Sequence, residues 1–119
     1  MKKTLVFGAT PNPERYSYKA VMRLKEKGYE VVAVGIRKGV IEGLEILPVD
    51  GTYEDVDTVS LYVNPEVQNS YCDYLLSLNP RRIIFNPGTE NVELATLALS
   101  KGIEVENACT LVLLSIGEY

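Results

Sequence analysis

The sequence contains no histidine, no tryptophan and only two cysteines among its 119 residues. The absence of histidine excludes histidine-based metal sites, serine–histidine nucleophiles and phosphohistidine chemistry within this chain. The two cysteines, Cys72 and Cys109, are far apart and form no CxxC pair, which favours a reducing compartment. No stretch approaches the ~20 apolar residues of a membrane span. We therefore expect a cytoplasmic protein that does not associate with a membrane.

The chain also lacks an excess of positive charge, because 12 Lys and Arg residues stand against 16 Asp and Glu residues. A general nucleic-acid-binding protein usually has the opposite balance, so we expect no nucleic acid partner. An anionic small molecule is compatible with the net charge of −4, because local cations in a pocket can oppose the global sign. The length suits one domain.

Short apolar runs alternate with helical patterns along the chain. The runs predict strands over residues 4–7, 29–36, 57–63, 81–85 and 103–107. Apolar residues at helical spacing predict helices over residues 16–27, 67–78 and 94–101, with a last short helix or buried tail over 109–119. Residues 37–43 are predicted as a loop and 44–49 as a possible short strand. Strands that are apolar on both faces and alternate with helices are typical of a doubly wound parallel sheet, here in a single α/β domain.

Turn residues follow each predicted strand, and this is where open parallel sheets bind ligands. Each turn alone is explained by ordinary turn chemistry. Their joint placement at one edge of the sheet favours a ligand site. The segments concerned are Gly8-Ala9-Thr10, Gly35 to Gly39, Val63-Asn64-Pro65, Asn86-Pro87-Gly88 and Asn107-Ala108-Cys109.

The first of these turns can bring backbone N–H groups close to a pyrophosphate, because a strand ends there in glycine before a helix. It lacks the GxGxxG dinucleotide fingerprint, since no further glycine follows Gly8 in the loop. The fingerprint also requires an acidic residue after the second strand, where this chain has Arg37 and Lys38. Two cations at that position suit a phosphate, and a solvated basic turn is about equally compatible with them.

Several segments together resemble the small CoA-binding proteins related to the amino-terminal domain of the succinyl-CoA synthetase alpha subunit. They are FGATPNPERYSYKAVMRLKEKGYEVVAV, GLEILPV, VDTVSLYVNPE, IIFNPGTENVELATLALSKGIEV and NACTLV, which cover nearly the whole chain. The resemblance implies a Rossmann-like CoA-binding domain over residues 1–119. Ligase activity is not implied, because the synthetases use a phosphorylated histidine in a second domain.

The resemblance also implies which residues contact the cofactor. Gly8, Ala9 and Thr10 would line the phosphate loop, and Lys38 with Gly39 would approach the CoA phosphates. The segment around Asn64 would flank the nucleotide, and that around Pro87 would lie near the pantetheine end. The full set of expected CoA-binding residues is Gly8, Ala9, Thr10, Asn12, Arg15, Ser17, Gly35, Arg37, Lys38, Gly39, Val63, Asn64, Pro65, Asn86, Pro87, Gly88 and Cys109.

Three functions fit these observations. The first is a non-catalytic module that binds CoA or acyl-CoA, and the second is an NADP-dependent or other nucleotide-using enzyme in which Arg37 and Lys38 hold the 2′-phosphate. The third is a regulatory subunit with a vestigial site. No set of residues in the sequence forms a nucleophile, base and oxyanion site, which favours the first. Cys109 could form a mixed disulfide with CoA, although a buried thiol without a role is the simpler reading.

Overall fold

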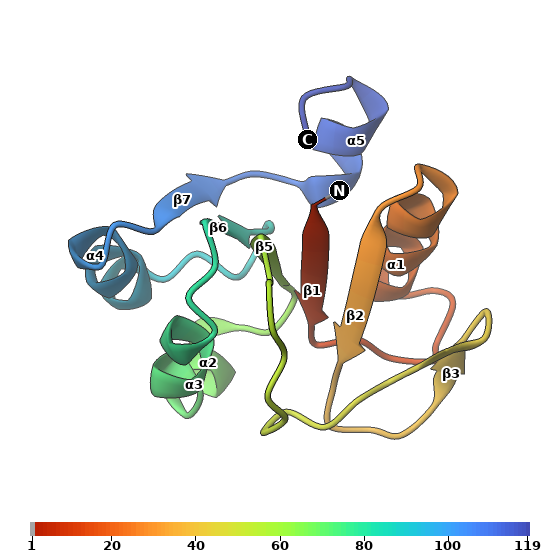
Figure 1. Cartoon of the computed structure of the whole chain (residues 1–119), viewed down its shortest axis with the longest axis horizontal. Helices are drawn as coiled ribbons and strands as arrows, with labels where there is room; N and C mark the ends of the chain where they lie inside the picture. The colour runs from red at the N-terminus through yellow and green to blue at the C-terminus, as the bar shows by residue number, and fades with distance from the viewer. Residues whose placement is uncertain (1) are drawn as a thin grey trace.

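A computed structural model describes residues 2–119, which form an α/β domain built on a parallel sheet (Figure 1). The sheet has five strands in the order β2-β1-β5-β6-β7. All neighbouring strands run parallel, so that Leu5 lies opposite both Val32 and Val59. The prediction of a doubly wound parallel sheet in one domain is confirmed. The strands are β1 (Lys3–Phe7), β2 (Glu30–Val34), β5 (Thr58–Leu61), β6 (Arg82–Phe85) and β7 (Glu104–Asn107).

A short hairpin follows β2. It corrects the prediction of a loop over residues 37–43, and it limits the possible short strand over 44–49 to two residues. It pairs β3 (Val40–Ile41) with β4 (Leu44–Glu45) in antiparallel fashion. Glu42 and Gly43 both have positive φ, the backbone of a two-residue hairpin turn. Leu47 then forms a single parallel bridge with Val34 of β2. Leu47 therefore lies on the outer side of β2, at the position that a further edge strand has in a Rossmann-like fold.

Helices cover the two faces of the sheet, and each face has its own apolar core (Figure 1). Leu5, Phe7 and Phe85 point towards one layer of helices, and Val6 and Ile84 point towards the other. The alternation follows from the period of two along a strand. The first layer contains α2 (Pro65–Asn69), α3 (Cys72–Ser77) and α4 (Val92–Ser100), and the second contains α1 (Tyr16–Glu26) and α5 (Thr110–Ser115).

The prediction of a single helix over residues 67–78 is wrong, because the structure has two helices there. α2 ends at Asn69, and the backbone N–H groups of Ser70 and Tyr71 close a tight turn on Val67 and Gln68. Asn and Ser compete with the helical backbone through their short polar side chains, which favours a helix end at this point. The break turns the Tyr71 ring towards Phe7, with 5.4 Å between the ring centroids.

Candidate functional site

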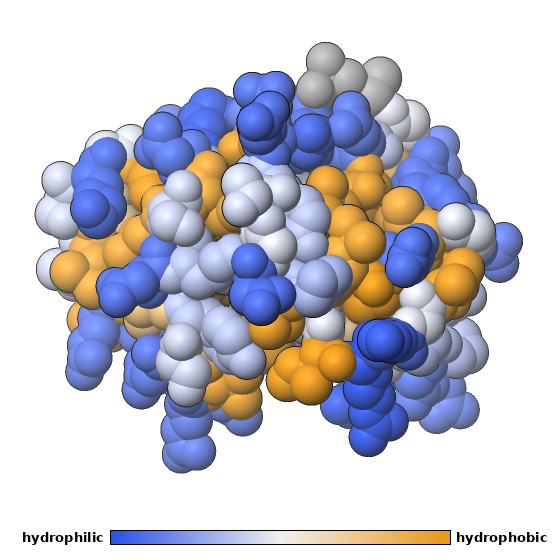
Figure 2. All heavy atoms as spheres, turned by 60° about the horizontal axis from the view of Figure 1, so that its bottom comes forward, coloured by the Kyte–Doolittle hydropathy of each residue, from blue (hydrophilic) through white to orange (hydrophobic). Residues whose placement is uncertain are grey.

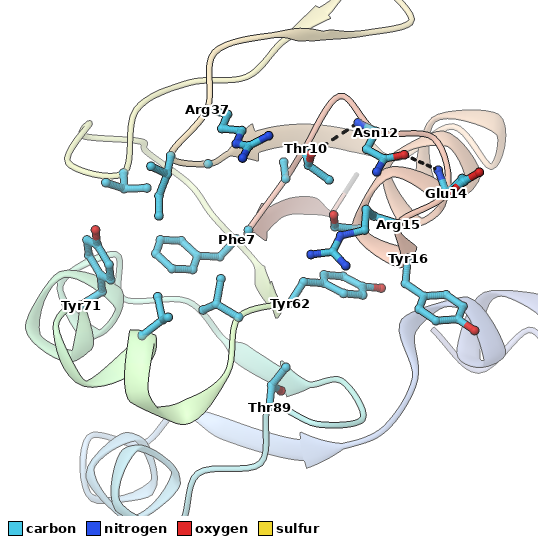
Figure 3. A pocket seen from close by; sticks show the side chains of 18 of the residues that line it. Phe7, Thr10, Asn12, Glu14, Arg15, Tyr16, Arg37, Tyr62, Tyr71 and Thr89 are labelled. Carbon is cyan, nitrogen blue, oxygen red and sulfur yellow. Dashed lines mark hydrogen bonds between the residues drawn. The ribbon is translucent and has the colours of Figure 1, made fainter.

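A pocket of about 640 Å³ opens at the carboxyl ends of β1, β2, β5 and β6 (Figure 3). β1 lies between β2 and β5, so the chain reverses its direction of strand addition here. Parallel sheets bind ligands at such a switch point. Figure 2 brings this end of the sheet forward and shows exposed hydrophobic residues between hydrophilic ones. The lining residues are Phe7, Gly8, Ala9, Thr10, Asn12, Glu14, Arg15, Tyr16, Ser17, Gly35, Ile36, Arg37, Val49, Tyr62, Val63, Val67, Tyr71, Pro87 and Thr89.

Two glycines allow the loops after β1, β2 and β5 to touch one another. A Cβ atom on Gly35 would lie 2.2 Å from the Ala9 carbonyl oxygen, which is far inside van der Waals contact. Gly8 has φ of +101°, and a Cβ atom there would lie 2.8 Å from a methyl group of Val63. Neither position accommodates a side chain without a shift of the pocket itself. The small residues that the sequence analysis noted in these turns therefore serve close loop packing.

The backbone amides of Gly8 and Ala9 do not point into the pocket. Both N–H groups donate to the Val34 carbonyl, each at 2.9 Å. The glycine turn is predicted from the sequence to bring its amides close to a pyrophosphate, but in the structure these two amides join β1 to β2. Any anion in the pocket must therefore find its donors elsewhere.

The N-terminus of α1 supplies such donors. Its N-cap residue, Arg15, makes no side-chain capping bond, and the first turn contains no acidic residue. Unpaired N–H groups and the helix dipole favour an anion at this position. Two hydrogen bonds order the preceding loop. The backbone N–H of Asn12 donates to Thr10 Oγ1, and the backbone N–H of Glu14 donates to Asn12 Oδ1 (Figure 3). Ser17, in the first turn, is buried beside the pocket.

Two guanidinium groups stand on the same side of the pocket. Figure 3 shows Arg37 and Arg15 on the upper side, with Thr10 between them, and Glu14 further out. We name this side, residues 10–17 and 35–37, the arginine wall. Lys38 is exposed and does not line the pocket, although the family resemblance placed a phosphate contact there. Gly39 lies behind the wall, where a Cβ atom would meet Pro11 at 2.9 Å.

The opposite side of the pocket is less polar and comes from the segments after β5 and β6. We name it the valine wall, and its members are Val63, Val67, Tyr71, Pro87 and Thr89. Tyr71 packs edge to face on Phe7 at the bottom of the pocket. A ligand between the two walls would thus meet cations on one side and apolar surface on the other.

Five other residues expected to bind the cofactor lie in or beside the loops and do not line the pocket. Asn64 caps α2 by accepting from the Val67 amide at 3.0 Å, and Pro65 begins that helix. Asn86 is buried, donates to Ser60 Oγ and to the Leu61 carbonyl, and accepts from the Thr110 amide. Gly88, with φ of +91°, donates its amide to Glu90. The half-buried Cys109 caps α5 without a side-chain bond.

Five aromatic or polar residues of the lining were not expected from the sequence: Phe7, Glu14, Tyr62, Tyr71 and Thr89. Tyr62 comes directly after β5, so the rule that singled out Val63 could have found it. Its hydroxyl is buried near Ser60 and Thr110 without reaching hydrogen-bonding geometry. Burial raises the pKa of Tyr62 to about 12, so this phenol stays protonated at neutral pH.

A half-polar, half-apolar crevice at the switch point of an α/β sheet is the place where open parallel sheets bind ligands. The model of the CoA binding domain family matches residues 2–115, and the chain belongs to this family. No curated protein matches the chain. Within residues 2–119, no helix is long and apolar enough to cross a membrane, and no group of three or more Cys, Asp or Glu side chains could hold a metal ion.

Solved structures share the fold over all or nearly all of the chain. An uncharacterized protein known from its crystal structure is 51% identical, with a TM-score of 0.97 over 100% of this chain and 98% of its own. A hypothetical protein from Pyrococcus horikoshii OT3 is 26% identical, with a TM-score of 0.84 over 93% of this chain and 80% of its own. A Thermus thermophilus protein, cell-free ID.343, is 23% identical and has a TM-score of 0.86 over 99% and 90%.

Proposed function

We propose that the protein binds CoA or an acyl-CoA in the pocket between the arginine wall and the valine wall, and that it does so without catalysing a reaction. Membership of the CoA-binding family supports the choice of cofactor. The observation that carries the proposal is the pocket at the switch point, open to the uncapped end of α1 on one side and apolar on the other. The proposed binding domain spans residues 1–119.

The phosphates of CoA fit the arginine wall. Arg15 and Arg37 can each donate charge-assisted hydrogen bonds to phosphate oxygens, and the first-turn N–H groups of α1 add further donors. Thr10 and Ser17 contribute hydroxyl groups beside them. The uncharged parts of the cofactor then lie towards the valine wall, where burial of apolar surface adds affinity.

The absence of a catalytic role rests on the chemistry of the lining. Its ionisable side chains are Glu14, the two arginines and three tyrosines, and no histidine, lysine or cysteine belongs to it. Tyr62 is held in its neutral form, and the Glu14 carboxylate lies on the outer side of the arginine wall. No nucleophile is paired with a base in this set. A cytoplasmic location is part of the proposal, because both thiols are free.

The proposal is tested by titrating the protein with CoA, acetyl-CoA and NADPH, using calorimetry and thermal unfolding. A ligand at ~100 times its dissociation constant should stabilise the fold by ~2.7 kcal/mol. We expect CoA or acetyl-CoA to raise the melting temperature and to be recovered unchanged after incubation. Binding of NADPH alone would contradict the choice of cofactor. Release of free thiol from acetyl-CoA in the presence of the protein would contradict the non-catalytic role.

A further inference from the structure

We propose that Gln68 is a positioning residue for the ligand, because its side-chain amide fixes the two segments of the valine wall relative to each other. The proposal rests on the function proposed above and assigns a role to a residue that does not itself line the pocket. Gln68 lies on α2 and is completely buried, with 0% of its surface exposed.

The Gln68 amide bridges two loops that are far apart in the sequence. Its Nε2 donates to the Val63 carbonyl at 2.8 Å, in the segment after β5. The same nitrogen donates to the Thr89 carbonyl at 2.7 Å, in the segment after β6. Val63 and Thr89 both line the pocket and both lie outside any helix or strand. Gln68 thus connects the two halves of the valine wall from behind.

The orientation of this amide is determined by Asn91. Asn91 Oδ1 caps α4 by accepting from the Leu94 amide at 3.1 Å, so its Nδ2 must be the group that faces Gln68. That Nδ2 donates to Gln68 Oε1 at 3.1 Å. The NH2 group of Gln68 is therefore directed at the two carbonyl oxygens. These three contacts use both the donor and the acceptor of a side-chain carboxamide.

This arrangement makes the distance between the two segments depend on the Gln68 amide. The two segments follow neighbouring strands, and Thr89 also donates its backbone amide and its hydroxyl to the Asn86 carbonyl, which lies in its own segment. Removal of the Gln68 donor takes one hydrogen bond from each of the two loop carbonyls. Both loops are then expected to shift so that these carbonyls can bond to water. A pocket that is open to its ligand for only a fraction of the time has its apparent affinity reduced by that fraction. The expected signature is a weaker ligand affinity in a protein that is still folded.

The test compares Gln68→Met, Asn91→Ser and a control, Ile103→Ala, by calorimetry with CoA at a temperature where all are folded. Met keeps the length of the side chain and removes the donor, and Ser keeps a cap on α4 but removes the Nδ2 group. Ile103 is buried just before β7, at the opposite end of the strands from the pocket. We expect Gln68→Met to bind CoA about tenfold more weakly and Asn91→Ser about threefold more weakly. Ile103→Ala should lose stability and keep the parental affinity.

Each result separates the two proposals. If the parent does not bind CoA, the proposed function fails and the positioning role fails with it. If the parent binds CoA and Gln68→Met binds it equally well despite a lower melting temperature, only the positioning role is overturned. If Gln68→Met does not fold, Asn91→Ser decides, and parental affinity in that variant overturns the role. A loss of affinity in Ile103→Ala as large as in Gln68→Met would also overturn it, because the effect would then follow stability alone.

Discussion

Arg37 and Lys38 are adjacent cations after β2, and replacing each with alanine tests which of them meets the ligand. Arg37 lines the pocket, whereas Lys38 is exposed outside it. Both substitutions remove one positive charge from the same loop. Any difference between the two variants therefore reports a direct contact rather than the general field of the protein.

The expected losses of affinity differ by about a factor of five. A charge-assisted hydrogen bond contributes ~1.5–3 kcal/mol, and exposure of Arg37 to water places it at the lower limit, about tenfold in affinity. A charge that acts through water from ~8 Å contributes only about 0.5 kcal/mol before salt screening, or roughly twofold. We expect Arg37→Ala to weaken CoA binding about tenfold and Lys38→Ala at most about twofold.

Calorimetry with CoA at low and high salt provides the measurement, with denaturant unfolding as the check on stability. Both variants should unfold like the parent, because neither side chain is buried. The twofold effect of Lys38→Ala on affinity should vanish at high salt, because Lys38 acts only through long-range charge and makes no direct contact with the ligand. Equal losses in the two variants, or a larger loss in Lys38→Ala, would refute the placement of the phosphates beside Arg37.

Three further predictions concern stability. Gly35→Ala should destabilise the fold by about 1–3 kcal/mol in denaturant unfolding and weaken CoA binding, because its Cβ atom would lie 2.2 Å from the Ala9 oxygen; parental values would contradict the packing argument. Hydrogen bonds from Arg81 lower the pKa of Asp57, so the stability that this pair contributes is complete above the ordinary carboxyl pKa of ~3.9 and is lost as pH falls through the lower folded value. Arg81→Met should flatten this acid limb of the stability curve, and an unchanged limb would count against the pair. Tyr62→Phe should leave stability unchanged or raise it by up to about 1 kcal/mol, because the buried hydroxyl has no hydrogen-bond partner; a clear loss would show that the hydroxyl is bonded.

The class of fold could be predicted from the sequence because the signal is local. Runs such as residues 30–34 and 82–85 are apolar on both faces, and a strand of that kind needs a helix layer on each side. The break inside the predicted 67–78 helix could not be predicted from the sequence. Its position at Ser70 depends on the turn after α2 and on the packing of Tyr71 against Phe7. An apolar pattern with helical spacing continues through that break, so periodicity cannot detect it.

The location of the candidate site was also determined by the sequence alone. Turn residues after parallel strands must gather at one edge of the sheet, and ten of the expected residues, Gly8, Ala9, Thr10, Asn12, Arg15, Ser17, Gly35, Arg37, Val63 and Pro87, do line the pocket. Which groups line the pocket was decided only by the tertiary structure. The Gly8 and Ala9 amides bond to Val34, a residue of the neighbouring strand, and Lys38 does not line the pocket although Arg37 does. The Gln68 hydrogen bonds, which join the segment of Val63 to the distant segment of Thr89, depend on how the chain packs. The local pattern of residues therefore does not predict them.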